Sequence, residues 1–159
     1  MSDPSPETTV LTRVQSLAPE AIESVSSAGA ELQVYVKPAR LKRLMGRLLN
    51  DEILGPAVLT DLAVLPAVGC PGQFEVLYSL MWPEWRQRLG VKVALRDSEH
   101  RLDSLTGIWP CADWLEREAW DLCGVVFEGH PDLRRILLPE ESEGHPLAGR
   151  APRSGEPRA

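Results

Sequence analysis

The sequence has little cysteine and little lysine. Only three of its 159 residues are cysteine, and Cys70, Cys111 and Cys123 show no C-x-x-C spacing. This odd number indicates neither a disulfide framework nor a zinc site with paired ligands. Lysine also occurs only three times, against 14 arginines, and acidic residues outnumber basic ones by 23 to 17. A formal net charge of −6 is the opposite of what phosphate contacts require, so we expect no nucleic acid partner.

The sequence also lacks a long uninterrupted apolar run. Its most apolar stretch, residues 53–71, is broken by Pro56, Asp61 and Pro66. It does not supply the roughly 20 apolar residues of a membrane helix. The first ten residues are polar and acidic and show no signal-peptide pattern. We therefore expect a protein of the reducing cytoplasm; if it sits at a membrane, something else holds it there.

Phosphate-binding and nucleophile motifs are absent as well. Neither G-x-x-x-x-G-K nor G-x-G-x-x-G occurs, which argues against the usual phosphate and dinucleotide loops. No G-x-S-x-G motif occurs either, and no cysteine has an obvious histidine partner. With 43% hydrophobic residues in 159, the chain can still form one domain with a real core. At this size, folding should bury about two thirds of the unfolded surface.

Hydrophobic periodicity predicts an α+β fold. A first helix ends before Pro19, and alternating side chains around Ala28-Gly29 predict a hairpin. An apolar stripe in residues 38–52 predicts an amphipathic helix, while residues 98–110 are expected to be loop. Three further strands are expected over residues 56–66, 73–82 and 90–97.

The expected architecture has two layers, with helices packed on a mixed or antiparallel sheet. Its element order is helix-strand-strand-helix-strand-strand-strand, followed by one more helix and a loop-rich C-terminal extension. We expect the sheet domain to cover residues 1–124 and the extension to cover residues 125–159. The tail from about residue 148 has no large apolar residue, so it is expected to be disordered when alone.

The last helix is predicted over residues 113–123, with Gly124 as its left-handed C-terminal residue. Asp113 and Glu116 have the spacing of a capping box. Arg117 could pair with the carboxylate four residues before it or four residues after it. The side chains expected to face the core are Leu115, Ala119 and Leu122.

Acidic residues on another face of this helix precede a histidine. Glu118 and Asp121 are followed by the turn at Gly129, and Pro131 holds His130 in an extended backbone. These groups could converge as acid and base catalysts. The alternative is a charge-laced helix followed by a rigid loop, and the sequence alone favours that alternative.

Two other interpretations of this region have weaker support. Cys111, Cys123, His130 and His145 could form a four-ligand metal set, but their spacing matches no paired zinc pattern. Residues 130–132 spell the His-Pro-Asp tripeptide of J-domain co-chaperones. Here the tripeptide follows a short acidic helix in a strand-rich chain, which is the wrong context for a J-domain.

Taken as one segment, residues 116–147 resemble the signature of the 30 kDa subunit family of respiratory complex I. The family includes the C subunit of the bacterial NADH:quinone oxidoreductase. Its pattern is Glu-Arg-Glu, two residues, Asp, two large apolar residues, a glycine-bearing stretch, His, and a basic residue before an apolar pair. Residues 144–147, Gly-His-Pro-Leu, resemble the family's later G-x-P-L element. The residues on the first pattern are Glu116, Arg117, Glu118, Asp121, Leu122, Gly124, His130, Arg134, Ile136 and Leu137.

This sequence departs from the family pattern at two places. Cys123 stands where members usually carry phenylalanine or another bulky apolar residue, and a free cysteine packs as a small hydrophobe. After Leu147 the usual basic run is missing and only Arg150 is nearby. The resemblance therefore implies a shortened contact between the C-terminal arm and its neighbour.

The resemblance implies a cofactor-free structural subunit in the hydrophilic arm of a proton-translocating NADH:quinone oxidoreductase. Such a subunit packs against the large quinone-site subunit, near cluster-bearing subunits, on the cytoplasmic side of the cell membrane. Flavin and iron–sulfur clusters would belong to the partners. The motif does not separate this complex from a membrane-bound energy-converting hydrogenase. A stand-alone hydrolase using Glu118, Asp121 and His130 is a third, less favoured hypothesis.

Partner contacts are predicted in the stretch FEGHPDLRRI, residues 127–136. An unpaired buried charge costs several kcal/mol, so adjacent arginines are poor core residues. We therefore expect Arg134 and Arg135 to grip partner carboxylates, while His130 and Asp132 hold the loop in shape. No catalytic, cofactor-binding or metal-binding residue is predicted. The predicted partner-binding or family-motif residues are Glu116, Arg117, Glu118, Asp121, Gly124, Gly129, His130, Pro131, Asp132, Arg134, Arg135 and His145.

Overall fold

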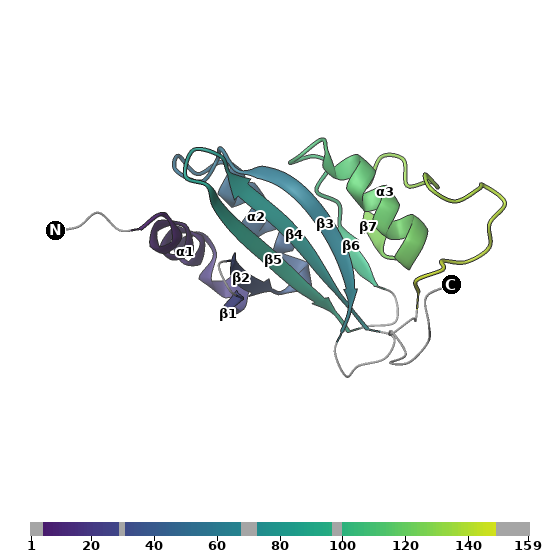
Figure 1. Cartoon of the computed structure of the whole chain (residues 1–159), viewed down its shortest axis with the longest axis horizontal. Coiled ribbons are helices and arrows are strands. Elements are labelled where there is room, and N and C mark those ends of the chain that lie inside the picture. The colour runs from purple at the N-terminus through teal and green to yellow at the C-terminus, as the bar shows by residue number, and fades with distance from the viewer. Residues whose placement is uncertain (1–4, 29–30, 68–72, 97–99, 149–159) are drawn as a thin grey trace.

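A mixed five-stranded sheet forms the centre of the protein (Figure 1). The structure is a computed structural model and describes residues 5–28, 31–67, 73–96 and 100–148. Cys70 and the tail expected to be disordered beyond residue 148 lie outside the described residues. None of the helices in the described ranges has the length and apolarity needed to span a bilayer.

The strands follow the spatial order β1-β2-β5-β4-β3. β2 pairs in parallel with β5, and the other neighbours are antiparallel. This arrangement confirms the expected mixed sheet and the hairpin at its first edge. The strands are β1 (Ile22–Ala28), β2 (Glu31–Val36), β3 (Val58–Pro66), β4 (Phe74–Trp82) and β5 (Gln87–Leu95).

Two helices precede the second half of the sheet. α1 (Pro6–Leu17) begins after Ser5, whose hydroxyl accepts the Thr8 N–H at 3.3 Å. α2 (Leu41–Leu49) follows a short 3-10 turn at Pro38–Arg40, so it is shorter than the helix predicted over residues 38–52. Its fully buried stripe is Leu41, Leu44, Met45 and Leu48.

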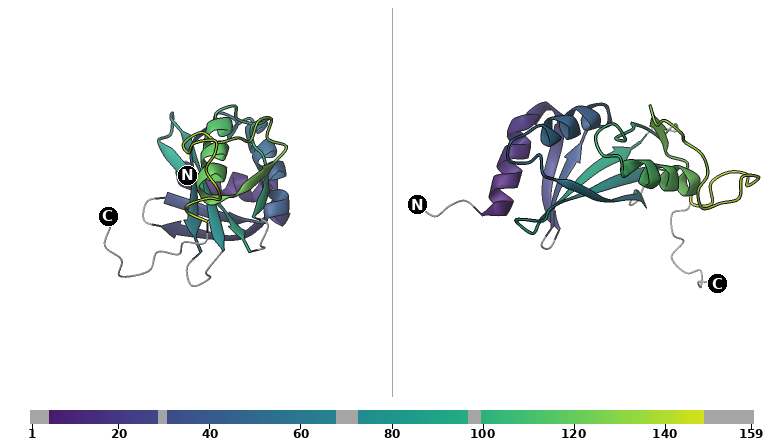
Figure 2. Two further views of the ribbon diagram at one scale, coloured as in Figure 1. Left: turned by 90° about the vertical axis from the view of Figure 1, so that its right-hand side faces the viewer. Right: turned by 90° about the horizontal axis from the view of Figure 1, so that it is seen from above.

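One face of the sheet forms the core. In β4, alternate side chains from Phe74 to Trp82 are buried, as period-two patterning requires. α2 lies behind the sheet in Figure 1, and the right-hand view of Figure 2 shows it along one side of the sheet. The Trp82 indole N–H also donates to the Leu54 carbonyl at 3.0 Å. These contacts confirm a two-layer α+β fold.

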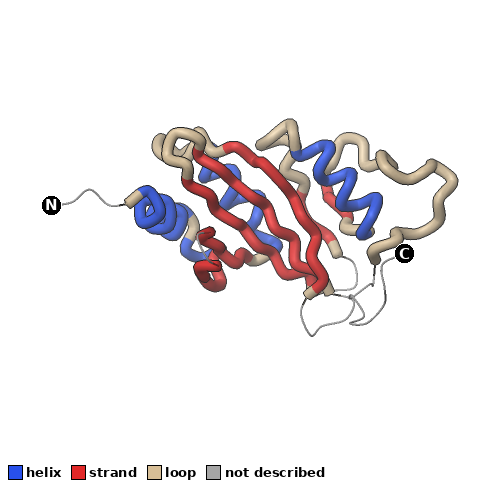
Figure 3. Tube along the Cα trace, viewed as in Figure 1, coloured by secondary structure: helices blue, strands red, loops and turns tan. Residues whose placement is uncertain are grey.

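A second, smaller sheet joins the chain segments that precede and follow the last helix. β6 (Arg101–Asp103) pairs in parallel with β7 (Val126–Glu128), and Leu102 lies beside Phe127. The prediction that residues 98–110 are entirely loop is therefore wrong. Three residues carry too little periodicity to signal a strand, and the pairing partner is distant in sequence. Figure 3 shows both short strands next to the last helix.

Candidate functional site

The family-like motif begins on α3 (Ala112–Cys123). The helix starts after Cys111 without a side-chain cap, so the prediction that Asp113 is the N-cap is wrong. Asp113 lies inside the first turn instead. At the other end, Gly124 adopts the left-handed conformation with φ of 79°, and its N–H bonds to the Trp120 carbonyl at 2.9 Å. The predicted C-terminal stop is confirmed.

Glu116 is completely buried. Its Oε1 accepts the Leu105 backbone N–H at 2.7 Å, which ties α3 to the turn after β6. The predicted capping box with Asp113 is therefore wrong, because this carboxyl points into the protein. Burial raises the pKa of Glu116 and outweighs the opposing hydrogen bonds from Leu105 and Ser104. Burial therefore disfavours the charged form of this carboxyl relative to an exposed one.

The buried side of α3 differs from the apolar side that was predicted. Leu115 and Leu122 are only partly buried, although Ala119 is buried as expected. Charged residues fill much of the protected side because Leu105 binds Glu116 and the C-terminal chain folds over Arg117 and Asp121. The buried residues of α3 are Ala112, Glu116, Arg117, Ala119, Asp121 and Cys123.

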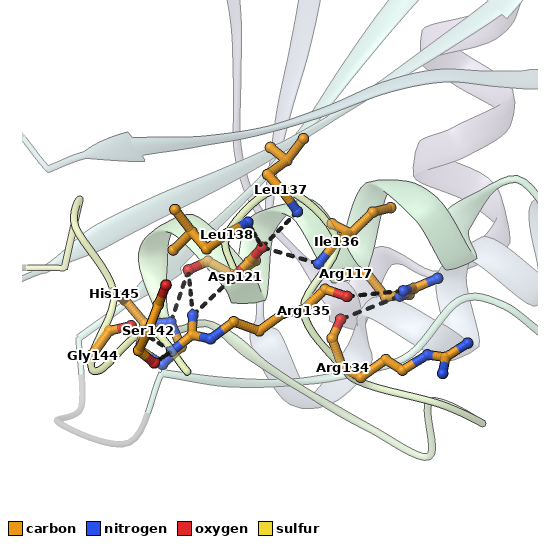
Figure 4. Close-up of polar contacts among 10 residues, drawn as sticks. All are labelled: Arg117, Asp121, Arg134, Arg135, Ile136, Leu137, Leu138, Ser142, Gly144 and His145. Atoms are coloured by element: carbon orange, nitrogen blue, oxygen red, sulfur yellow. Dashed lines mark hydrogen bonds and ion pairs between the residues drawn. The ribbon is translucent and has the colours of Figure 1, made fainter. Parts of the chain in front are cut away.

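The Asp121 carboxylate, which has no solvent exposure, is the centre of the polar network in Figure 4. Its Oδ2 accepts backbone N–H groups from Ile136, Leu137 and Leu138 at 3.0, 2.8 and 2.9 Å. Its Oδ1 accepts Arg135 Nη1 at 2.7 Å. Burial alone would raise the pKa of Asp121, but these hydrogen bonds outweigh it and hold the pKa well below its ordinary value of 3.8.

Arg135 extends the network from Asp121 to the end of the loop. Its Nη2 donates to the carbonyls of Ser142 and Gly144 at 2.6 and 2.9 Å. The guanidinium also lies 5.6 Å from the Trp120 ring centre, and the side chain is only 12% exposed. The prediction that Arg135 grips a partner needs correction, since this group is used inside the chain.

Arg117 ties the helix to the backbone just before that loop. Its Nε donates to the Arg134 carbonyl at 3.2 Å, and its Nη2 donates to the Arg135 carbonyl at 3.1 Å. Its Nη1 lies 3.9 Å from the Asp113 carboxylate, and its guanidinium stacks over Trp114 at 5.1 Å. The other carboxylate predicted to pair with Arg117, that of Asp121, binds Arg135 instead.

Arg134 points away from this network (Figure 4). Its side chain is 68% exposed and pairs with Asp132 at 2.9 Å. His130 Nδ1 accepts the Asp132 N–H at 3.0 Å, so Nε2 carries the proton and donates to the Asp113 carbonyl at 3.2 Å. These contacts shape the loop after Gly129, whose φ is 80°.

The Gly-His-Pro-Leu element at residues 144–147 returns to the end of α3. His145 Nδ1 donates to the Asp121 carbonyl at 3.0 Å, and its ring meets Trp120 edge-on with centres 5.4 Å apart. The Leu147 N–H donates to the Leu122 carbonyl at 2.8 Å. Asp121, Arg135 and His145 thus belong to one structural unit.

The three candidate acid–base groups lie in different surroundings. Glu118 is exposed on α3, Asp121 is enclosed by donors, and His130 anchors its own loop. The hydrogen bonds of Asp121 and His130 go to other partners, so the arrangement proposed for a hydrolase is not formed.

The alternative metal set is not assembled either. Within the residues that the structure describes, no three or more His, Cys, Asp or Glu side chains gather as a metal site. Cys111 is exposed, and its Sγ lies 3.6 Å from the Leu59 carbonyl. Cys123 is buried, and burial raises the pKa of its thiol. It packs as the small hydrophobe that its position predicts.

Several partners in the network were missed by sequence reasoning. Ser142, Gly144 and residues 136–138 contribute only backbone groups. A backbone donor or acceptor leaves no side-chain signal. The sequence contains only one hint of this network, which is that an aspartate and an arginine occur in the same motif.

This geometry defines a class of α+β domain. In this class, a buried Asp–Arg pair ties the last helix to a C-terminal loop. The chain matches the family model described as "Respiratory-chain NADH dehydrogenase, 30 Kd subunit" over residues 34–157, and it belongs to that family.

Curated relatives from several bacteria resemble the chain over most of its length. It is 38% identical over 148 residues to the C subunit of NADH-quinone oxidoreductase from Roseiflexus sp. (strain RS-1), covering 93% of this chain and 85% of the relative. The protein of the same name in Geotalea uraniireducens (strain Rf4) is 32% identical over 158 residues, covering 99% and 95%.

Two solved structures have a similar fold. The trypsin-resistant fragment (1-134) of Nqo5 aligns with a TM-score of 0.63 and 32% identity, covering 79% of this chain and 97% of the fragment. A chain of the membrane-bound sulfane sulfur reductase, an archaeal respiratory membrane complex, aligns with a TM-score of 0.69. Its identity is 20% over 83% of this chain and 78% of that chain, so it shows a shared fold alone.

Proposed function

We propose that this chain is a cofactor-free structural subunit in the hydrophilic arm of a proton-translocating NADH:quinone oxidoreductase. In that role it packs against the large quinone-site subunit and supports electron transfer from NADH to quinone. It lies on the cytoplasmic side of the cell membrane and is held there through the complex. Flavin and iron–sulfur clusters reside in the partner subunits.

One observation carries this proposal more than any other. Two charged residues of the family-like motif hold the chain's own C-terminal loop: Asp121 accepts four hydrogen bonds through its carboxylate and Arg135 reaches two loop carbonyls. Groups that are bound in this way supply neither a nucleophile nor a free base. Their arrangement supports a structural role for the motif, in which its residues shape a protein surface.

The choice of complex rests on sequence similarity, because the fold is not specific. The fold also occurs in a membrane-bound sulfane sulfur reductase. Relatives at 32–38% identity over nearly the whole chain are named as the C subunit of NADH-quinone oxidoreductase. This similarity favours the NADH-linked complex over an energy-converting hydrogenase.

Purification of the tagged full-length chain from membranes of the cells that produce it tests the proposal. We expect the large quinone-site subunit and the cluster-bearing subunits to co-purify, together with NADH:quinone reductase activity. The chain produced alone should show no visible absorption band and no stoichiometric iron. Recovery with a subunit that carries paired nickel-ligating C-x-x-C motifs would favour the hydrogenase, and a coloured isolated chain would contradict the cofactor-free assignment.

A further inference from the structure

The core between the sheet and α3 contains two buried oxygen atoms without a hydrogen-bond partner. They are the Tyr78 hydroxyl oxygen and Glu116 Oε2, and they are the only such side-chain atoms within the residues that the structure describes. Both side chains have no solvent exposure, and the other oxygen of Glu116 already accepts the Leu105 N–H. Buried polar atoms in folded proteins nearly always have a partner. We therefore looked for a group that could serve both atoms.

The two side chains belong to neighbouring parts of the core. Just before α3, Cys111 Sγ lies 3.6 Å from the Leu59 carbonyl of β3. From there α3 packs against β3 and runs in the same direction (Figure 1). The five helical residues to Glu116 advance about 7.5 Å, and two to three strand residues advance about 7–10 Å. Glu116 is therefore level with Leu62, which pairs with Tyr78 across β3 and β4.

The two atoms have complementary needs. Burial, followed by the negative charges of Glu116 and Asp103, raises the pKa of Tyr78 well above its ordinary value of 10.0. The hydroxyl therefore keeps its proton and needs an acceptor, while the carboxylate oxygen needs a donor. The two atoms are not hydrogen-bonded to each other. A small molecule that accepts one hydrogen bond and donates another would satisfy both.

We propose that Tyr78 and Glu116 bind one internal water molecule between β4 and α3. The water accepts the Tyr78 O–H and donates to Glu116 Oε2. Buried waters characteristically bridge polar groups that would otherwise be unsatisfied, and such a bridge is nearly as favourable as a direct hydrogen bond. A cation would suit the carboxylate but would leave the Tyr78 O–H without an acceptor. The water thus ties the central sheet to the helix of the family-like motif.

A crystal structure of the full-length chain, at a resolution that shows ordered water, tests the proposal. We expect one electron-density peak at about 2.5–3.0 Å from both Tyr78 Oη and Glu116 Oε2. Tyr78→Phe removes the hydroxyl and keeps the ring, so this peak should be weakened or lost. The matched control is Tyr35→Phe at the other tyrosine, whose hydroxyl lies 3.5 Å from Lys92 Nζ. This control should keep the peak.

NMR of the same proteins checks the site in solution. A bound water should give a nuclear Overhauser effect to the ring protons at position 78 in wild type and in Tyr35→Phe, and none in Tyr78→Phe. A wild-type structure without a peak between the two oxygens would overturn the proposal, whether or not Tyr78→Phe folds. So would a direct hydrogen bond between Tyr78 and Glu116, or a peak that persists unchanged in Tyr78→Phe.

Discussion

At Asp121, a carboxylate without solvent exposure accepts three consecutive backbone N–H groups and one guanidinium. The charge is stabilised by these donors, and the donors are satisfied by the charge. A buried donor that loses its acceptor keeps its full desolvation cost. The network should therefore be sensitive to the loss of any one member.

Asp121→Asn should lower the free energy of unfolding by about 3–5 kcal/mol, the usual cost of breaking a buried ion pair. The amide cannot satisfy all four donors, and it leaves the Arg135 charge without its counterion. Urea unfolding measures the change. Asp132→Asn is the control, because the exposed Asp132–Arg134 pair contributes at most about 1 kcal/mol. Equal midpoints for both variants would contradict the account of the network.

The same carboxylate sets an acid dependence. Because the pKa of Asp121 in the folded protein is below its ordinary value of 3.8, its stabilising contribution is present above pH 3.8. That contribution is lost as the pH falls below this value towards the folded pKa. In Asp121→Asn, this part of the acid dependence should disappear from the free energy of unfolding.

Glu116 has the opposite linkage. Burial raises its pKa in the folded protein above the ordinary value of 4.5. The contribution of Glu116 to stability is therefore greatest below pH 4.5 and falls as the pH rises through the folded pKa. Glu116→Gln retains an oxygen for the Leu105 N–H and should be as stable as wild type, or more stable, at neutral pH. Glu116→Ala orphans that N–H and should lose about 1–3 kcal/mol. If Gln destabilises as much as Ala, the buried acid is charged.

Burial of these charges could not be predicted from the sequence. Glu116, Arg117 and Asp121 have the appearance of a solvated helix face, and Leu115 and Leu122 look like the core side. The burial pattern reverses because chain segments on both sides of α3 supply backbone partners. Leu105, before the helix, binds Glu116, and the chain after Gly124 binds Arg117 and Asp121. The family resemblance marked the right residues without indicating which of them face inward.

Among the elements, the end of α3 depends on a single residue. Gly124 has φ of 79°, and a Cβ at this position would lie 2.9 Å from His145 Cδ2. An L-residue there meets backbone strain of roughly 1–2 kcal/mol and must also displace the His145 ring. Gly129 has a similar φ of 80°, with nothing within 4 Å of its Cβ position.

Gly124→Ala should therefore destabilise the fold more than Gly129→Ala. The difference isolates the contact with His145, because both variants share the strain. Thermal unfolding of the two proteins measures it. Equal losses would show that the ring moves at no cost, and an unchanged Gly124→Ala midpoint would contradict the left-handed helix end.

Elements with strong periodicity were predicted well from the sequence. The leucine stripe of α2 and the alternating side chains of β4 both face the core as expected. β6 was missed because Arg101–Asp103 is short and mostly polar. Its hydrogen bonds come from β7, which lies beyond the intervening helix. Short strands of this kind are defined by tertiary pairing rather than by local pattern.

At the scale of the whole molecule, variants at Arg134 and Arg135 test folding and assembly separately. Arg135→Ala removes an internal tie and should lower the melting temperature by several degrees. Arg134→Ala removes an exposed group, so the isolated chain should melt as wild type does. Recovery of the assembled complex should nevertheless fall, because Arg134 remains a predicted partner contact. Normal assembly of Arg134→Ala would show that this arginine is only solvated charge.

The most direct test of the proposed function is quinone reduction by NADH in membranes of cells that lack this chain. We expect the activity to be lost and to return when the full-length wild-type chain is supplied. Asp121→Asn should restore less than wild type, in proportion to the folded chain that it supplies. Membranes that reduce quinone with NADH at the wild-type rate in the absence of the chain would contradict its role as a subunit of that complex.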